Sequence, residues 1–554
     1  MPSRDSTNAP RRRAERKAKP EDSIEKFSPD ARDRAIEKLL KRKGDKLPKI
    51  SREKLEHVRA LKPSFKRFHG VKVPIAWFPW WLWRTPCSDK FGYLTPKSVR
   101  AATKLPFNPP TRTLLEQLGD FMADPARGAG GNSTIPAGYT YFGQFVDHDI
   151  TLDIDSNLDT EQDATTLNNM RSPSLDLDSV YGRGPAMDPF FYQFPNSGPP
   201  TAIKLLLGAN QNFGPGGPGS AGGAGPMGIP TNSDLPRVST QTAVIGDPRN
   251  DENLIVSQFH HAMLKFHNQV VDGLVVAGFA GDIFLEAKSI VTHHYQWAVI
   301  NDFLKRVCGA AAVSSAMGSV AAPPGSPFAM PVEFAVAAYR FGHSMIRERY
   351  WINQAQINAS LGDVFAFSRN PLLPVFSNWV VDFNAFFDTG LFAAVNNKAT
   401  KIDSTLAPGL DVLPGFAGLM AMLASRNLLR GLALGLPSGQ GVAGHFGVPA
   451  LTEAQLKQGL LADEVALLNS HGGLLLKKTP LWYYVLREAA VLSAGNQLGP
   501  VGGRIVAETF VRLLKRNPDS FVNATPAFTP LLPSATPGDF TVADLVNFAG
   551  VTVP

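Results

Sequence analysis

Residues 254–275, LIVSQFHHAMLKFHNQVVDGLV, decide the fold class. Their apolar side chains recur every three or four positions, the pattern of one buried face on a long helix. The segments 284–306, 332–347 and 454–468 are also long and helix-like, whereas strand-like alternation is short and scarce. The sequence therefore predicts a mainly α protein with few short strands. The repeating apolar positions are Ile255, Phe259, Met263, Phe266, Val270 and Leu274.

Composition predicts a folded body with a basic extension. The chain has 554 residues, of which 44% are hydrophobic and 19% are charged, as in ordinary globular proteins. Residues 1–66 hold a dense run of Lys and Arg, and the remainder is close to neutral although the whole chain carries a formal charge of +7. We expect a partly disordered extension over 1–66 and one domain over 67–554. The stretch 208–229, rich in Gly, Pro and Ser, predicts a surface loop.

Two features of the N-terminal part bear on partners. A basic tail can bind nucleic acid or an anionic membrane, but this one has neither interleaved aromatic residues nor a nucleic-acid motif. We therefore expect a solvated extension and no nucleic-acid partner. The apolar segment Ile75–Trp83 is far too short to span a membrane. Burial against the body is the favoured role for this segment, and a peripheral contact with lipid or a partner stays open.

The number of cysteines and the N-terminal sequence limit which kinds of site and which compartments are expected. Only Cys87 and Cys308 occur, which excludes a disulfide framework and a cysteine-ligated zinc or iron–sulfur site. The N-terminus lacks the charged, apolar and small-residue pattern of a signal peptide. We expect a protein that stays in the cytoplasm or is secreted without a leader.

A histidine flanked by two aspartates lies in an aromatic-rich stretch, YTYFGQFVDHDITL, at residues 139–152. On a helix, neighbouring side chains point about 100° apart, so Asp147 and Asp149 leave the helix in different directions from His148. Histidine is the side chain that ordinarily exchanges a proton near neutral pH, so His148 could act as an acid or base, and Asp149 could bind a cation. A surface triplet without chemistry is the alternative.

The loop RSPSLDLDSVYGRG, residues 171–184, is rich in oxygen-bearing side chains. In an extended loop, alternate residues point to the same side, and oxygen ligands are those that calcium prefers. The loop is no EF-hand, and an ordinary polar turn is the alternative. The alternating polar residues are Ser172, Ser174, Asp176 and Asp178.

Two further stretches combine charge or histidine with a helix. Arg249, in GDPRNDE at residues 246–252, could stabilise a developing anion or form a surface ion pair. In VEFAVAAYRFGHSMIRERYWIN, residues 332–353, Tyr339 and His343 lie four residues apart and share a helix face. Without further context, His343 is more simply a core histidine with a hydrogen-bond partner than a metal ligand.

Together these stretches resemble the animal-type haem peroxidases of the peroxidase–cyclooxygenase superfamily, in order, from Gly143 to Pro437. GQFVDHD resembles the distal-histidine motif of that superfamily, GDPRNDENLIVSQFHHAMLKFHN its catalytic-arginine segment and YRFGHSMI its proximal-histidine motif. Asn427, in ASRNLLRGLALGLP, matches the asparagine that partners the proximal histidine. Each motif alone is weak, whereas four in the right order, with the cation loop, are specific.

The resemblance implies haem b as cofactor, hydrogen peroxide as oxidant and a halide or small organic molecule as donor. It implies that His343 ligates the haem iron, that Asn427 orients this histidine, and that Arg340 faces a propionate. It further implies that His148 is the distal base, that Arg249 stabilises negative charge, and that Gln144 orders water or a halide.

The resemblance also implies a calcium ion and a covalent haem. The calcium would be held by Asp149 together with Ser172, Ser174 through its carbonyl, Asp176 and Asp178. Asp147 and Glu252 match two carboxylates that form ester bonds to haem in many relatives. Asn253 stands where one relative has a methionine that forms a sulfur link, so that link is not expected.

Departures from the superfamily pattern leave two alternatives open. Asp178 stands where a serine is common, LLRGLALGLP follows Asn427 in place of a charged stretch, and the cysteine framework of secreted relatives is missing. Fatty-acid dioxygenases of the superfamily use a tyrosine three residues before the proximal histidine, whereas that position here is Arg340 and Tyr339 lies one residue earlier. The pattern favours a peroxidase over a dioxygenase. A non-enzymatic binding module on the same fold is the second alternative, although His148, Arg249 and His343 are all retained.

Overall fold

The computed structural model describes residues 65–68, 71–74, 90–127, 130–211, 232–367, 372–392 and 394–552. The basic extension expected over 1–66 lies outside these residues except at its last two positions, and the apolar segment 75–83 lies wholly outside them. Most of the loop expected over 208–229 lies outside them too. Of the two units into which the chain divides, Phe65–Pro554 holds every described residue.

The described part is mainly helical, as the sequence predicts. No described helix is long and apolar enough to cross a membrane. The α-helices are α3 (Lys97–Thr103), α4 (Pro109–Met122), α5 (Gly138–Ile150), α6 (Asp178–Tyr181), α7 (Leu254–Val276), α8 (Ile283–Ala298), α9 (Leu304–Cys308), α10 (Ala310–Ser319), α11 (Leu361–Ala366), α12 (Leu423–Ala433), α13 (Gly439–Phe446), α14 (Glu453–Lys457), α15 (Ala462–Lys477), α16 (Leu481–Ser493), α17 (Pro500–Arg516) and α18 (Val542–Phe548).

The strands are short and pair two by two. Four pairs are antiparallel, and β3 pairs with β7 in parallel. The paired strands are β1 (Phe65–Phe68) with β2 (Val71–Pro74), β3 (Lys90–Gly92) with β7 (Ala329–Pro331), β4 (Asn132–Pro136) with β10 (Lys398–Thr400), β5 (Tyr192–Gln193) with β6 (Lys204–Leu205), and β8 (Arg349–Tyr350) with β9 (Ala359–Ser360).

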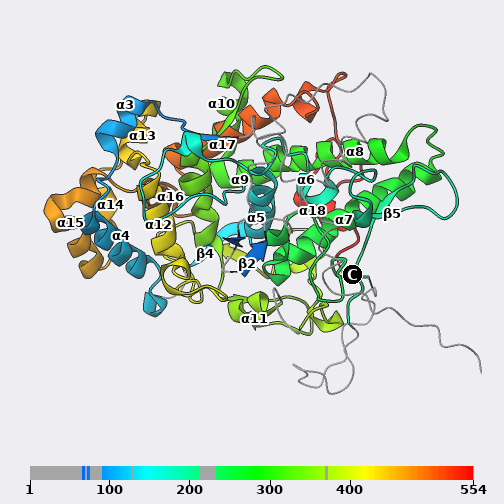
Figure 1. The fold of residues 1–554 in the computed structure, drawn as a ribbon, viewed down its shortest axis with the longest axis horizontal. Helices are drawn as coiled ribbons and strands as arrows, with labels where there is room; N and C mark the ends of the chain where they lie inside the picture. The colour runs from blue at the N-terminus through cyan, green and yellow to red at the C-terminus, as the bar shows by residue number, and fades with distance from the viewer. Residues whose placement is uncertain are drawn as a thin grey trace, which may run out of the picture. The chain divides into compact units, whose positions relative to one another are not determined.

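Helix α5 lies at the middle of the molecule, with α7 on one side and α12 on the other (Figure 1). Its Phe142 and Phe145 pack edge-on against Phe259 of α7, with ring centroids 5.5 and 5.3 Å apart. Both rings also meet Tyr295 of α8. The N-terminal end of α5 is fixed by Gly138, because a Cβ there would lie 2.6 Å from the carbonyl oxygen of Phe386. α5 is therefore held rigidly at its start and along one face.

Three predicted helices differ from a regular α-helix. The segment 284–306 contains a π-helix over Val299–Phe303, between α8 and α9. The segment 332–347 folds as a π-helix over Glu333–Ala337 and a 3-10 helix over Ala338–Met345. Side chains take the carbonyls that an α-helix would pair internally: Arg340 donates to the carbonyl of Ala335, and Trp482 donates to the carbonyl of Arg340. The segment 454–468 is broken between α14 and α15, where Gly459 adopts a φ of +73°.

Candidate haem and cation sites

Helix α5 presents polar side chains in two directions. Gln144, Asp147 and His148, spaced three and one residues apart, line one cavity. Asp149 turns away from that cavity and meets the loop 171–184, where its Oδ2 accepts hydrogen bonds from Tyr295 Oη at 3.2 Å and Leu177 N at 3.4 Å. One helix therefore borders two separate sites, as the 100° step between neighbouring side chains requires.

The imidazole of His148 is held by the segment that precedes α7. Its Nδ1 lies 2.8 Å from Oδ1 of Asn250, and its Nε2 lies 3.8 Å from Oε1 of Glu252. Glu252 also accepts a hydrogen bond from Nε2 of Gln144 at 2.6 Å. Burial is the largest effect on Glu252 and raises the pKa of its carboxyl group. The start of α7 is fixed in turn because Asn253 caps it, accepting hydrogen bonds from two backbone N–H groups of the first turn.

Arg249 lines the same cavity and is firmly anchored. Its Nη2 donates to Oδ2 of Asp247 at 2.7 Å and to the backbone carbonyls of His148 at 3.1 Å and Thr151 at 2.7 Å. Asp247 also caps the short helix Pro248–Asp251 by accepting a hydrogen bond from Arg249 N. The guanidinium group therefore ties the end of α5 to the segment before α7.

His343 lies on the 3-10 helix Ala338–Met345 and borders the same cavity. Its Nδ1 lies 2.8 Å from the side-chain amide of Asn427 on α12. Burial, followed by the positive charges of Arg340 and Arg426, holds the pKa of His343 well below its usual value. The imidazole is therefore neutral, as a metal ligand must be. Arg340, on the same 3-10 helix as His343, lies close to α5, since its Nη1 is 3.8 Å from Oδ2 of Asp147.

One cavity of about 600 Å³ brings these side chains together, a volume in the usual range for ligand sites. Eight residues singled out in the sequence line it, although they come from segments almost 300 positions apart. Part of its remaining lining is apolar and comes from residues 361–365 and 410–423. The eight residues are Gln144, Asp147, His148, Arg249, Glu252, Arg340, His343 and Asn427.

The arginines that line the cavity indicate whether its charge suits a haem, which carries two propionate carboxylates. Arg340, Arg426 and Arg430 all line it. Burial and the charges of Arg430 and Arg340 lower the pKa of Arg426 to about 10. The buried Nε of Arg430 has no hydrogen-bond partner in the part of the chain that the structure describes. Like charges held together in this way favour an anionic ligand, and a flat cofactor with two carboxylates and an iron atom fits both the arginines and the histidines.

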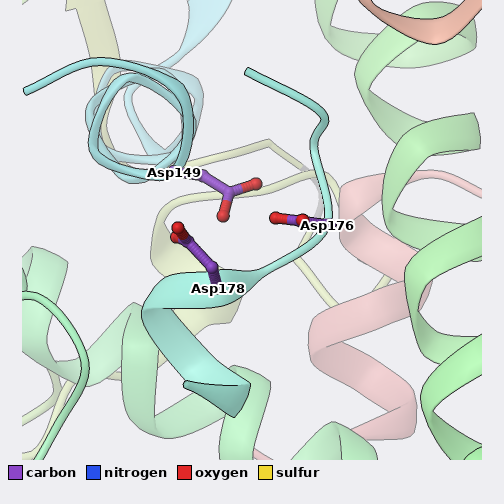
Figure 2. Close-up of side chains that lie close together, drawn as sticks. All are labelled: Asp149, Asp176 and Asp178. Atoms are coloured by element: carbon purple, nitrogen blue, oxygen red, sulfur yellow. The ribbon is translucent and has the colours of Figure 1, made fainter. Parts of the chain in front are cut away.

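The second site is a cluster of three carboxylates on the other side of α5. Oxygen atoms of Asp149, Asp176 and Asp178 lie within 4.8 Å of one another and point toward a common centre (Figure 2). Oδ1 of Asp149 is buried and has no hydrogen-bond partner among the described residues. Leu175 and Leu177, which flank Asp176, adopt left-handed backbone conformations with φ of 51° and 57°. Such strain persists where a site demands it, and these carboxylates fit a divalent cation.

The two serines of the predicted calcium loop have different hydrogen-bond partners. Ser172 borders the cluster, since its Oγ donates to Oδ2 of Asp176 at 3.0 Å. The backbone carbonyl of Ser174 accepts a hydrogen bond from Nδ2 of Asn517 at 3.1 Å. The structure therefore brings Ser172 and the three aspartates together and directs the Ser174 carbonyl to a partner on another segment.

Electrostatics also fit a cation at this cluster. Burial, and then the neighbouring carboxylates of Asp178 and Asp176, raise the pKa of Asp149 well above its usual value. Burial and Asp176 raise the pKa of Asp178 to about 7 against the opposing effect of Arg171. Carboxylates gathered in this way repel one another unless protons or a cation compensate their charge.

A divalent cation bound at this cluster should therefore stabilise the protein, and its removal should destabilise it. A cation present at a hundred times its Kd contributes about 2.7 kcal/mol to folding. We expect purified protein treated with a chelator to unfold at a lower temperature, and added calcium to restore the original Tm. Asp149→Asn should abolish this calcium response, whereas Asp163→Asn, which alters a solvent-exposed acid that caps a nearby turn, should retain it. A Tm indifferent to chelator and calcium would contradict the site.

Sequence reasoning missed several residues around these sites. Asn250 contacts His148, and its position directly after Arg249 is a sequence signal that could have indicated a place at the site. Arg171 and Asp247 gave no hint, because their contact joins segments 76 residues apart. Arg426 and Arg430, close to Asn427 in the sequence, line the cavity but stood out only as part of the Asn427 motif.

Comparison with known proteins assigns the class. A model of the animal haem peroxidase family matches residues 159–525, which is more than half of the chain. The chain therefore belongs to the animal haem peroxidase family, and membership implies that it binds haem. The matched range contains Arg249, His343 and Asn427 and begins after His148. No curated protein matches the sequence.

Solved structures share the fold at low sequence identity. Peroxidase A from Dictyostelium discoideum is 16% identical over 79% of this chain and 89% of its own, with a TM-score of 0.52. The fatty acid alpha-dioxygenase of Oryza sativa is 12% identical over 72% of each chain, with a TM-score of 0.52. That of Arabidopsis thaliana is 11% identical over 79% of this chain and 72% of its own, with a TM-score of 0.50. These likenesses are in the fold and include both activities.

Proposed function

We propose that this protein is a haem peroxidase that reduces hydrogen peroxide and oxidises a halide or a small organic donor. The observation that carries the proposal is the single cavity that His148 and His343 both line, together with Arg249 and Gln144. The catalytic domain would span 67–554, with 1–66 as a basic extension, and no nucleic-acid partner is expected.

His343 would hold the haem through Nε2, with Asn427 as its orienting partner. The nitrogen and oxygen of an amide have nearly the same shape, so the Asn427 side chain can present Oδ1 to an Nδ1–H of His343. That arrangement leaves the lone pair of Nε2 for the iron. Arg340, with Arg426 and Arg430, would neutralise the propionates. Asp147 and Glu252, which both line the cavity, would be the carboxylates for ester links to haem b.

Haem supplies the redox chemistry: peroxide is reduced to water, and the donor supplies the electrons. His148 would take the proton from one peroxide oxygen and return it to the other as the oxygen–oxygen bond breaks. Nδ1 lies 2.8 Å from Oδ1 of Asn250, so a tautomer with the proton on Nδ1 would donate to this oxygen and leave the lone pair of Nε2 to accept the peroxide proton. Arg249 would stabilise the negative charge on the departing oxygen, and Gln144 would position water or a halide.

The proposed calcium ion would act by fixing the position of His148. Asp149 follows His148 on α5, so an ion shared by Asp149, Asp176 and Asp178 joins the end of α5 to the loop 171–184. Rigid placement of an acid or base is a large part of its catalytic effect. The ion would therefore keep His148 at a constant position in the cavity.

The position of Tyr339 favours a peroxidase over a fatty-acid dioxygenase. Tyr339 is buried, donates a hydrogen bond to the carbonyl of Gly143 at 3.2 Å and stacks on Phe334. It is not among the described residues that line the cavity, whereas Arg340 is. A tyrosine that forms a radical for attack on a fatty acid has to border the substrate cavity. Of Tyr339 and Arg340, only Arg340 borders it, and the tyrosine that does line it is Tyr141 of α5, outside the proximal-histidine motif.

Tyr339→Phe should therefore leave peroxide turnover unchanged. The lost hydrogen bond to Gly143 costs about 1 kcal/mol of folding free energy, so a small decrease in Tm is expected. Peroxide-dependent oxidation of a dye and oxygen uptake with linoleate should be measured on the same preparation. Oxygen uptake by the wild type that disappears in Tyr339→Phe would contradict the peroxidase proposal and support the dioxygenase.

The proposed function is tested on full-length protein purified with added haem. We expect a Soret band, a spectral change on addition of peroxide, and a return to the starting spectrum when iodide, bromide or a phenol is supplied. Oxygen uptake with linoleate or arachidonate in the absence of peroxide would identify a dioxygenase. Protein that binds haem but leaves peroxide unreduced, or that binds no haem, would be a non-enzymatic module.

A further inference from the structure

Four side chains with charges of alternating sign connect the carboxylate cluster with Arg249; Asp178 is partly exposed and the other three are buried. Nη1 of Arg171 donates to Oδ1 of Asp178 at 2.9 Å, and its Nε donates to Oδ2 of Asp247 at 2.9 Å. The same oxygen of Asp247 accepts a hydrogen bond from Nη2 of Arg249 at 2.7 Å. A cation ligand and an active-site arginine are thereby joined through two intervening side chains.

Burial restricts the movement of the charged side chains in this series. Arg171 is 3% exposed, Asp247 is 0% exposed and Arg249 is 8% exposed. A buried ion pair that loses one partner leaves an uncompensated charge, which is costly. The carboxyl of Asp247 is ionised throughout, because Arg171 and Arg249 hold its pKa far below its usual value despite burial. None of the four charges can therefore change partners without moving its neighbour.

Charge balance explains the aspartate at position 178. Arg171 opposes the charge of Asp178, and Arg249 opposes that of Asp247. Asp149 and Asp176 then remain, and their two negative charges equal those that a divalent cation neutralises. The carboxylate that stands where a serine is common thus has its own counter-charge, and Arg171 is the residue that supplies it.

We propose that Arg171 is a positioning residue that couples occupancy of the cation site to the placement of Arg249. When the cation leaves, the surplus negative charge around Asp178 attracts Arg171 away from Asp247. Asp247 then loses one of its two cationic partners, and its hold on Arg249 changes. The inference rests on the proposed haem function, since Arg249 matters only if an anion forms beside it.

Coupling of this kind is reciprocal: the cation must change the affinity for an anion in the haem cavity by the same factor as that anion changes the affinity for the cation. The probe is cyanide, whose Kd is read from the shift of the Soret band. We expect cyanide to bind the calcium-loaded wild type about 5- to 150-fold more tightly than the calcium-free protein, the range usual for coupled sites. Calorimetry should give the same factor for calcium with and without cyanide.

Arg171→Met separates coupling from a general structural role. It leaves Asp178 without its counter-charge, so calcium affinity should rise, on the order of tenfold, by simple electrostatics. The ratio of the two cyanide Kd values should fall to about 1. If Arg171 only supported the fold, calcium affinity would fall together with Tm. The matched control is Arg183→Met, which removes the ion pair of the partly exposed Arg183 with the buried Asp188, outside this series of charges, and should retain the wild-type ratio.

The outcomes are distinct from those of the haem proposal. Wild-type protein that holds calcium but shows no Soret band or cyanide shift refutes the haem function itself. Wild-type protein that binds cyanide equally with and without calcium, or Arg171→Met with the wild-type ratio, refutes the coupling alone. If Arg171→Met does not fold, Arg171→Lys takes its place. Lysine keeps the charge as a single point and cannot bridge both carboxylates, so the ratio should again fall.

Discussion

The His148→Leu variant is expected to reduce peroxide roughly 10²- to 10⁴-fold more slowly than the wild type, the usual worth of a positioned acid or base. Leucine fills a similar space but can neither accept nor return a proton. His343, Asn427 and the arginines of the cavity are unchanged, so the variant should bind haem with a normal Soret band. Stopped-flow measurement of the spectral change with peroxide gives the rate directly.

The matched control for this prediction is His267→Gln. His267 is a buried histidine on α7 whose ring nitrogens face Tyr181 and the carbonyl of Ile203, and it is not among the described residues that line the cavity. Burial lowers its pKa to about 4, so it is neutral at ordinary pH like many core histidines. The control should lose stability and keep its rate with peroxide. A His148→Leu variant that reacts as fast as the wild type would rule out His148 as the base.

Most expectations about the fold came from the spacing of apolar residues, and most expectations about the site came from local motifs. The apolar spacing in 254–275 predicts a helix that agrees with α7 to within one residue. The structure buries more than the one predicted face, since every residue from Leu254 to Leu264 is buried where α7 packs against α5 and α8. The motifs contain eight residues that the structure brings together in the lining of one cavity. Their chemical roles stay proposals.

Contacts between distant segments could not be read from the chain. Arg171 meets Asp247 only because α6 and the segment before α7 pack together, as the hydrogen bond from Gly246 N to the carbonyl of Ser179 also reflects. Glu333, at the start of the irregular helix over 333–345, accepts hydrogen bonds on its carboxylate from Leu94 and Thr95, more than 200 residues earlier. Periodicity predicts that a segment is helical, but such tertiary bonds decide its exact winding.

The His343→Ala variant is expected to lose its normal complement of haem. The arginines of the cavity would still attract the propionates, but the iron would have no protein ligand on that side. We expect the Soret band of the reconstituted variant to be weak and displaced and peroxide turnover to fall to background. Absorbance after gel filtration, with the haem-to-protein ratio, checks the loss.

Added imidazole distinguishes a lost ligand from a damaged fold. Alanine at this position leaves a cavity beside Asn427, and free imidazole can enter it, hydrogen-bond to Asn427 and ligate the iron. We therefore expect millimolar imidazole to restore the Soret band of His343→Ala. Asn427→Leu keeps the ligand and removes only its partner, so it should weaken haem binding or activity by about 10- to 100-fold, the usual effect of losing such a partner. A His343→Ala variant with an unshifted Soret band at full stoichiometry, before any imidazole is added, would mean that another residue ligates the iron.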